Sequence, residues 1–213
     1  MPIELDHVFV CANVGAPEGE RLVDLRFQEG SPNTHPGQGT ANRRFFFSDT
    51  TIELLWVSDA EEAQRQPAYR TQLWQRWSER RMGASPFGII ARPVDPTAPL
   101  DKFPGWEYRP DWLPKGLVVH VGDAAVEEPM WVYMDFLTRP QRQVTHPNGS
   151  RDITGIALET PVPLASPAAQ LFLQNQVLAQ QRGAEHLLII ELDHGLRGQS
   201  ADLRPDLPLV LRY

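Results

Sequence analysis

The sequence predicts an α+β fold made of two βαβββ-like modules, the second of them degenerate. The first module, residues 1–92, contains strand-like apolar runs around a short helical pattern. The second, residues 151–213, repeats the order strand, helix, strand and strand. Residues 93–150 connect the modules. This connection is rich in proline, which interrupts long helices, but it contains an extra pair of strand-like runs at 116–121 and 130–136.

A predicted hairpin at residues 35–59 is the centre of the first module. A glycine-rich turn leads into the run RRFFF at 43–47, a polar break follows, and the second apolar run spans 52–57. Glu53 interrupts the second run. A carboxylate between apolar strand residues is costly to bury without a partner. We therefore expect either that its face is open to water or that another group stabilises its charge.

The first strand-like run, residues 3–11, offers such a partner. Alternation along this run places His7, Phe9 and Cys11 on one face. His7 and Glu53 can then lie side by side in one sheet. Histidine and glutamate are common ligands of divalent metals, and they also form ordinary hydrogen-bonded pairs. Both interpretations are open on the residues alone.

These motifs resemble a known superfamily. The motif LDHV at residues 5–8, with GTANR at 39–43 followed by IELL at 52–55, is similar to the first module of the vicinal oxygen chelate superfamily, and more narrowly to its glyoxalase-like domain branch. The resemblance covers residues 3–92 and is faint over 152–213. It implies two modules whose curled mixed sheets surround a cleft, with the helices outside.

The resemblance also implies a metal site. In the superfamily the modules pair, and each contributes ligands from its first and third strands. His7 and Glu53 stand at the first module's ligand positions, with Glu53 the expected catalytic residue. In the second module, Gly155 replaces the expected histidine, and Pro208 and Leu209 replace the expected carboxylate.

A third ligand could come from His120, Glu191 or His194, and none of them matches the family motif. His120 lies on the Val118 face of a predicted strand, where a single histidine is more often a hydrogen-bonded core residue. Catalytic metal sites usually use three protein ligands. The expected cofactor is therefore one divalent metal (Zn, Ni, Mn or Fe) or none.

Four residues of the hairpin are predicted to contact a ligand. Alternation puts Asn42, Arg44 and Phe46 on one face of their strand, and Trp56 is the fourth. Either Arg44 or its neighbour Arg43 can hold an anion by a two-pronged hydrogen bond. An arginine paired with a nearby acidic side chain is an equally good interpretation.

Two functions follow from these residues and the resemblance. The first is an enzyme in which a metal at His7 and Glu53 polarises an oxygen of a small oxygenated, aromatic or anionic molecule, in a lyase, isomerase or dioxygenase reaction. The alternative is a metal-free protein that binds or sequesters such a molecule, as resistance proteins do. In a third interpretation the two residues are only a structural pair.

Composition narrows the partners and the location. The chain has 27 acidic and 20 basic residues, a net charge of −7, which argues against nucleic acid. Its single cysteine, Cys11, is expected to be a buried hydrophobe. No apolar run approaches the ~20 residues of a membrane span, and the N-terminus lacks signal-peptide features, so we expect a cytoplasmic protein without a membrane partner. We expect a monomer with its modules paired within one chain, or a homodimer.

Overall fold

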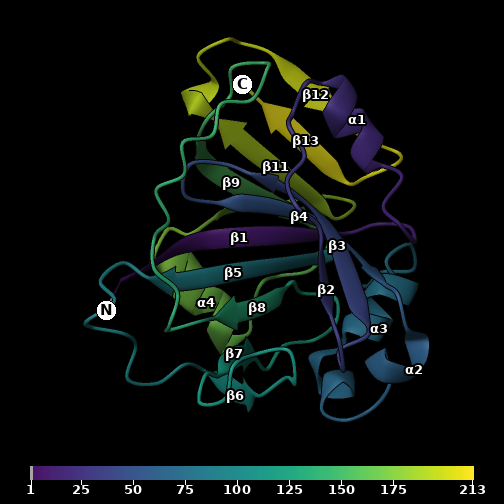
Figure 1. Ribbon diagram of the computed structural model, residues 1–213, viewed down its shortest axis with the longest axis vertical. Coiled ribbons are helices and arrows are strands. Elements are labelled where there is room, and N and C mark those ends of the chain that lie inside the picture. The colour runs from purple at the N-terminus through teal and green to yellow at the C-terminus, as the bar shows by residue number, and fades with distance from the viewer. Residues whose placement is uncertain (1) are drawn as a thin grey trace.

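The computed structural model describes residues 2–213 and contains two curled mixed sheets with short helices around them (Figure 1). The predicted α+β class is confirmed. The first sheet has eight strands, namely β1 (Ile3–Cys11), β2 (Asn33–His35), β3 (Thr40–Phe46), β4 (Thr51–Val57), β5 (Phe87–Pro93), β6 (Gly105–Tyr108), β7 (Val119–Gly122) and β8 (Met130–Tyr133). Their order across the sheet is β2-β3-β4-β1-β5-β8-β7-β6.

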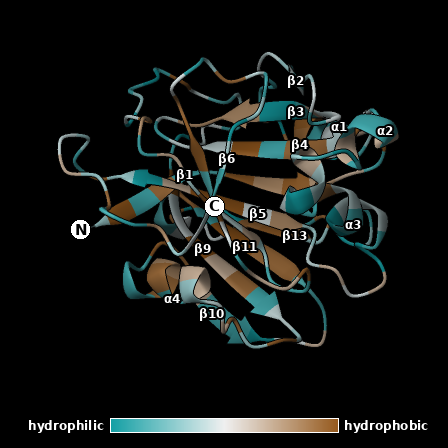
Figure 2. Ribbon diagram, turned by 90° about the horizontal axis from the view of Figure 1, so that it is seen from below, coloured by the Kyte–Doolittle hydropathy of each residue, from teal (hydrophilic) through white to brown (hydrophobic). Residues whose placement is uncertain are grey.

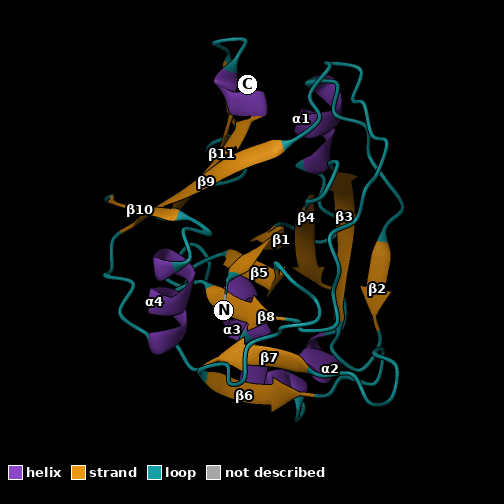
Figure 3. Ribbon diagram, turned by 90° about the vertical axis from the view of Figure 1, so that its left-hand side faces the viewer, coloured by secondary structure: helices purple, strands orange, loops and turns teal. Residues whose placement is uncertain are grey.

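The second sheet has five strands in the order β10-β9-β11-β13-β12, and these strands are β9 (Ile153–Thr160), β10 (Ala179–Arg182), β11 (Leu187–Leu192), β12 (Ser200–Asp202) and β13 (Leu209–Arg212). The helices are α1 (Gly19–Asp24), α2 (Ala60–Ala63), α3 (Leu73–Ser78) and α4 (Pro167–Gln174), with 3-10 turns η1 (Ala68–Thr71) and η2 (Asp193–Gly195). Figure 3 shows α1 and α4 beside the strands, on opposite sides of the view. No helix within residues 2–213 has the length and apolar character of a membrane span.

The two sheets share one pairing pattern. Across β4-β1-β5-β8-β7 the neighbours pair in the sequence parallel, antiparallel, parallel, antiparallel. The same sequence recurs across β10-β9-β11-β13-β12. The strand pair that we predict between the modules, β7 and β8, is therefore a continuation of the first sheet.

Alternate residues of β1 face two different apolar clusters. Val8 and Val10 belong to a large core that contains buried residues of both sheets, among them Leu158 and Ile190. Phe9 belongs to a second cluster formed by the first sheet and α3. The second sheet thus packs on one face of the first, and the other face of the first sheet is available for a site. Figure 2 shows the hydrophobic residues concentrated along the central strands.

A buried carboxylate attaches α4 to the first sheet. Glu128 is 6% exposed, and its Oε1 accepts hydrogen bonds from the backbone N–H groups of Ala165 and Ser166, both at 2.9 Å. Its Oε2 accepts from the Ser166 hydroxyl at 2.6 Å and from the Trp131 indole at 3.1 Å. Ser166 also caps α4 by accepting from the Ala169 N–H. Glu128, in the turn between β7 and β8, therefore fixes the position of the start of α4.

A buried guanidinium fixes the segment before β8. Arg76 on α3 is 1% exposed, and its Nη1 lies 2.8 Å from the carbonyl oxygen of Ser85, 2.9 Å from that of Val126 and 2.6 Å from that of Glu128. Burial lowers the pKa of Arg76 to about 10, so the side chain stays charged at neutral pH. Arg76 and Glu128 together link α3, the first sheet and α4.

His146 is a buried neutral histidine, and its protonation is expected to weaken the fold. Its ring lies 5.2 Å from the ring centre of Phe27 and 4.8 Å from that of Phe47. Its Nδ1 accepts from the N–H of Gln28 at 2.9 Å, so that nitrogen carries no proton in the folded state. Burial lowers the pKa of His146. The contribution of His146 to the free energy of unfolding is therefore fully present above the ordinary histidine pKa. It declines as the pH falls toward the lower pKa that His146 has in the folded state.

We expect the wild type to lose on the order of 1 kcal/mol of unfolding free energy through His146 between pH 7.5 and pH 5.5. Urea unfolding at both pH values, in the wild type and in His146→Asn, measures this contribution. The asparagine oxygen can still accept from Gln28 but does not titrate, so the pH-dependent loss is smaller in the variant. An identical loss in both proteins would contradict the assignment.

Candidate functional site

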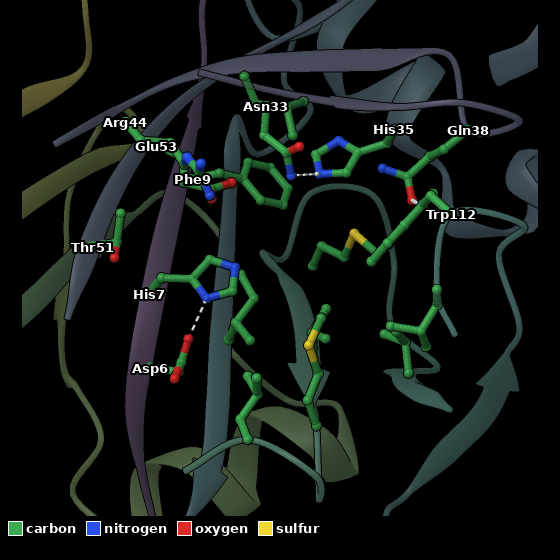
Figure 4. Close-up of a pocket in the computed structure, with 18 of the residues that line it drawn as sticks. Asp6, His7, Phe9, Asn33, His35, Gln38, Arg44, Thr51, Glu53 and Trp112 are labelled. Carbon is green, nitrogen blue, oxygen red and sulfur yellow. Dashed lines mark hydrogen bonds and ion pairs between the residues drawn. The ribbon is translucent and has the colours of Figure 1, made fainter. Parts of the chain in front are cut away.

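The free face of the first sheet encloses a cleft of about 280 Å³ (Figure 4). Every lining residue lies between Asp6 and Arg142, so the second sheet contributes none. One part of the lining is polar, with Asp6, His7, Asn33, His35, Gln38, Arg44, Thr51, Glu53 and Arg142. The remainder is apolar and includes Phe9, Leu55, Ile90, Met130, Val132, Met134 and Phe136.

A β-bulge turns Asp6 and His7 toward the same cleft. The register of β1 against β5 shifts between Leu5 and His7, so Asp6 is the extra residue and two consecutive side chains share one side. His7 Nδ1 lies 2.6 Å from Asp6 Oδ1, and the other Asp6 oxygen accepts from the buried guanidinium of Arg92 at 2.6 Å. Arg92 also donates to Glu4 at 2.8 Å.

This geometry sets the protonation of His7. Burial lowers the pKa of His7, but the hydrogen bond to Asp6 and the negative charges of Glu53 and Asp6 outweigh burial and raise it. Burial likewise raises the pKa of Asp6, while its hydrogen bonds to His7 and Arg92 lower it by more. Because Asp6 occupies Nδ1, the Nε2 of His7 is the nitrogen that can serve a ligand. His7 is 18% exposed, which is consistent with that access.

Glu53 lines the same cleft and is held by the predicted contact residue Asn42. In the parallel pairing of β1 and β4, Thr51 lies opposite His7 and Glu53 lies opposite Phe9. The two predicted ligands, His7 and Glu53, therefore lie on neighbouring strands and are offset by two residues along the strand direction. Asn42 is fully buried rather than in the cleft, and its Nδ2 donates to Glu53 Oε2 at 2.7 Å. It positions Glu53 and does not line the cleft.

Because side chains alternate along β3, Arg44 faces the cleft and its neighbour Arg43 does not. Arg43 points away from the cleft and forms a two-pronged ion pair with Glu29, at 2.7 and 2.6 Å. Arg44 and Phe46 line the cleft. Arg44 Nε donates to the carbonyl oxygen of Ser31 at 2.7 Å, which orients its guanidinium.

Three predicted residues lie elsewhere. Trp56 follows cleft-lining Leu55, so it faces the opposite side and packs against the core between the sheets. His120 likewise follows cleft-lining Val119 and points away from the cleft. Glu191 belongs to the second sheet, which packs on the other face. The predictions of His120 or Glu191 as a third metal ligand are therefore wrong, because neither side chain reaches the cleft. The prediction of Trp56 as a ligand contact is wrong for the same reason.

The donor set of the cleft does not fit a catalytic metal. Among residues 2–213 no three His, Cys, Asp or Glu side chains form a group that could hold an ion. Within residues 2–213, His7 Nε2 and Glu53 Oε1 have no hydrogen-bond partner, but both oxygens of Asp6 are engaged. Both ring nitrogens of His35 are hydrogen-bonded within its own hairpin, at 3.2 and 3.0 Å. Two free donors are fewer than the usual three protein ligands.

Loops from the two edges of the first sheet meet over the cleft. The turn between β2 and β3 carries His35 and Gln38, and the connection between β6 and β7 carries Trp112. The His35 and Trp112 ring centres are 5.1 Å apart, and Trp112 Nε1 lies 3.3 Å from Gln38 Oε1. Since β2 and β6 are the outermost strands, this contact shows how far the sheet curls. The glycine-rich turn and the proline-rich connection therefore border the cleft together.

Comparison with known proteins finds a similar fold but no activity. No protein-family model matches the chain, and no curated protein matches it. The structure is similar to a hypothetical protein from Staphylococcus aureus, with a TM-score of 0.54 and 12% sequence identity over 99% of each chain. It also matches a hypothetical protein from Bacillus halodurans C-125 with a TM-score of 0.37 and 12% identity, over 62% of this chain and 93% of that one. At this identity the first similarity concerns the fold alone, and the second is too low to carry a conclusion.

Proposed function

We propose that this chain is a glyoxalase-like protein of the vicinal oxygen chelate type that binds a small oxygenated molecule in the cleft without a metal. The observation that carries the proposal is the Asp6–His7 pair, which opens into a cleft with apolar walls. Concave sites of this kind, with a few convergent polar groups in an apolar lining, are typical of small-molecule sites. The curled mixed sheets are compatible with the resemblance of the motifs around His7 and Glu53.

His7 is the proposed contact to a ligand oxygen. Its raised pKa favours the imidazolium form, which donates from Nε2 while Asp6 holds Nδ1. Glu53, fixed by Asn42, faces the same space and can accept a hydrogen bond from a ligand hydroxyl. Together they place a hydrogen-bond donor and an acceptor on neighbouring strands of one cleft.

A metal-assisted lyase, isomerase or dioxygenase is the second candidate. It is favoured by one observation, namely that His7 Nε2 and a free oxygen of Glu53 line the same cleft. The incomplete donor set favours the metal-free proposal. Metal analysis of protein purified without chelators separates the two. Stoichiometric metal that falls in Glu53→Gln would support the second candidate and overturn the first.

Calorimetry on chelator-treated protein tests the metal-free proposal. A thermal-shift screen of small aromatic and hydroxylated acids supplies the probes. We expect the best probe to bind the wild type, and His7→Gln to weaken binding by about 10-fold to 100-fold, because a hydrogen bond to a charged group contributes ~1.5–3 kcal/mol. His186→Gln, outside the cleft, is the matched control and keeps the wild-type affinity. Equal affinity in His7→Gln would contradict the proposed contact.

A further inference from the structure

Arg142 enters the cleft from the long segment after β8. It is half-buried, and its backbone N–H donates to the carbonyl oxygen of Ser48 at 2.9 Å. Its Nη1 lies 3.2 Å from the carbonyl oxygen of Phe47, 3.1 Å from that of Thr50 and 3.3 Å from the Thr51 hydroxyl. The side chain is therefore held against the turn between β3 and β4, with its position fixed before any ligand binds.

Arg142 and Arg44 share one aromatic ring. Each guanidinium carbon lies 4.9 Å from the centre of the Phe46 ring, so the two carbons are no more than about twice that distance apart. Arg44 uses Nε and Nη2 for acceptors on Ser31 and Pro32. Within residues 2–213, Arg44 Nη1 and the Nε and Nη2 of Arg142 have no protein acceptor. Donors remain on both guanidinium groups at the polar end of the cleft.

The charge on Arg142 is incompletely balanced by the protein. Burial lowers the pKa of Arg142, and the positive charges of Arg92 and Arg44 lower it further, while Asp6 and Asp49 oppose this. Asp6 is already bonded to His7 and Arg92. An anion that entered the cleft would favour the charged form of Arg142, and Arg44 adds a second positive charge to the lining of the same cleft.

We infer that Arg44 and Arg142, on the shared Phe46 ring, bind the carboxylate of a ligand whose apolar body lies along Met130, Met134 and Phe136. This inference rests on the proposed function and names its substrate class, organic monocarboxylates. A planar carboxylate matches the fork of a guanidinium. A phosphate dianion is disfavoured because Glu53 and Asp6 line the same polar end.

The test compares head groups on one apolar body. Calorimetry on the wild type uses 4-phenylbutyrate, 4-phenylbutanamide and phenylpropyl phosphate. We expect the carboxylate to bind at least 10-fold more tightly than the amide, and more tightly than the phosphate. Equal affinity of the carboxylate and the amide would overturn the proposed binding of a carboxylate by Arg44 and Arg142, but it would leave binding in the cleft intact. Tighter binding of the phosphate would overturn the carboxylate assignment, and no binding of any probe at millimolar concentration would overturn both proposals.

Variants locate the effect at the two arginines. Arg142→Met and Arg44→Met, checked for folding by circular dichroism, are expected to lose 10-fold or more in affinity for the carboxylate and little for the amide. The control is Arg109→Met, because Arg109 is exposed, pairs with Glu107 and lies outside the cleft. Because Arg142 also bonds backbone carbonyls, Arg44→Met provides the independent test if Arg142→Met does not fold. Folded variants that keep the preference for the carboxylate would overturn the assignment.

Discussion

Replacing Arg76 with methionine is expected to lower the free energy of unfolding by about 3 kcal/mol or more. The methionine side chain fills similar space but removes the buried donor from the carbonyl oxygens of Ser85 and Glu128, while the Val126 oxygen keeps only the N–H of Ser85. Each buried acceptor left unsatisfied costs ~1–3 kcal/mol. The effect is large because a single buried side chain serves carbonyl oxygens in two segments, the one before β5 and the turn between β7 and β8.

Urea unfolding followed by far-UV circular dichroism measures this loss, provided that the slope with denaturant is unchanged. Arg81→Met is the matched control, since Arg81 is exposed and close to Arg76 in the sequence. We expect the control to stay within about 0.5 kcal/mol of the wild type. A similarly small change in Arg76→Met would show that water or a neighbouring group replaces the guanidinium.

Replacing Glu128 with glutamine is expected to cost about 3 kcal/mol, or a fall in Tm of about 6–12 °C for a chain of this size. The carboxylate accepts from four donors, on Ala165, Ser166 (twice) and Trp131. A glutamine has one acceptor oxygen, and its amide N–H groups would face the remaining donors. The start of α4 then loses its attachment to the first sheet.

Differential scanning calorimetry of Glu128→Gln and of Glu127→Gln tests this prediction. Glu127 is the exposed neighbour and makes no ion pair within residues 2–213, so its replacement is expected to leave Tm nearly unchanged. Equal Tm values for both variants would mean that the four hydrogen bonds contribute no net stability.

Residue type and alternation predict much of the site. They place His7 and Glu53 on neighbouring strands of one sheet, and both line the cleft. Alternation also separates Arg44 from Arg43, once one face is known to border the cleft. The same rule places the side chains of Trp56 and Glu53 on opposite faces of β4. The prediction of Trp56 as a ligand contact was therefore wrong, and alternation along the sequence already indicated this.

Other parts of the site depend on tertiary pairing that a single sequence does not encode locally. Asp6 shares the side of His7 only because β1 bulges against β5, a strand far away in the chain. Arg142 lies in a segment without regular secondary structure and reaches the cleft through contacts with the β3–β4 turn. The expectation that Glu191 supplies a ligand fails because the second sheet packs on the face of the first sheet that lies opposite the cleft.

The two-faced first sheet also separates two kinds of evolutionary constraint. Val8 and Val10 must fit the packed interior between the sheets, where any change of volume is felt. Leu55, Ile90 and Val132 face the cleft from β4, β5 and β8. Exchanges at these positions reshape the ligand's surroundings without disturbing the interior behind them. A protein built in this way can acquire new small-molecule preferences by mutational drift on one surface while its scaffold stays intact.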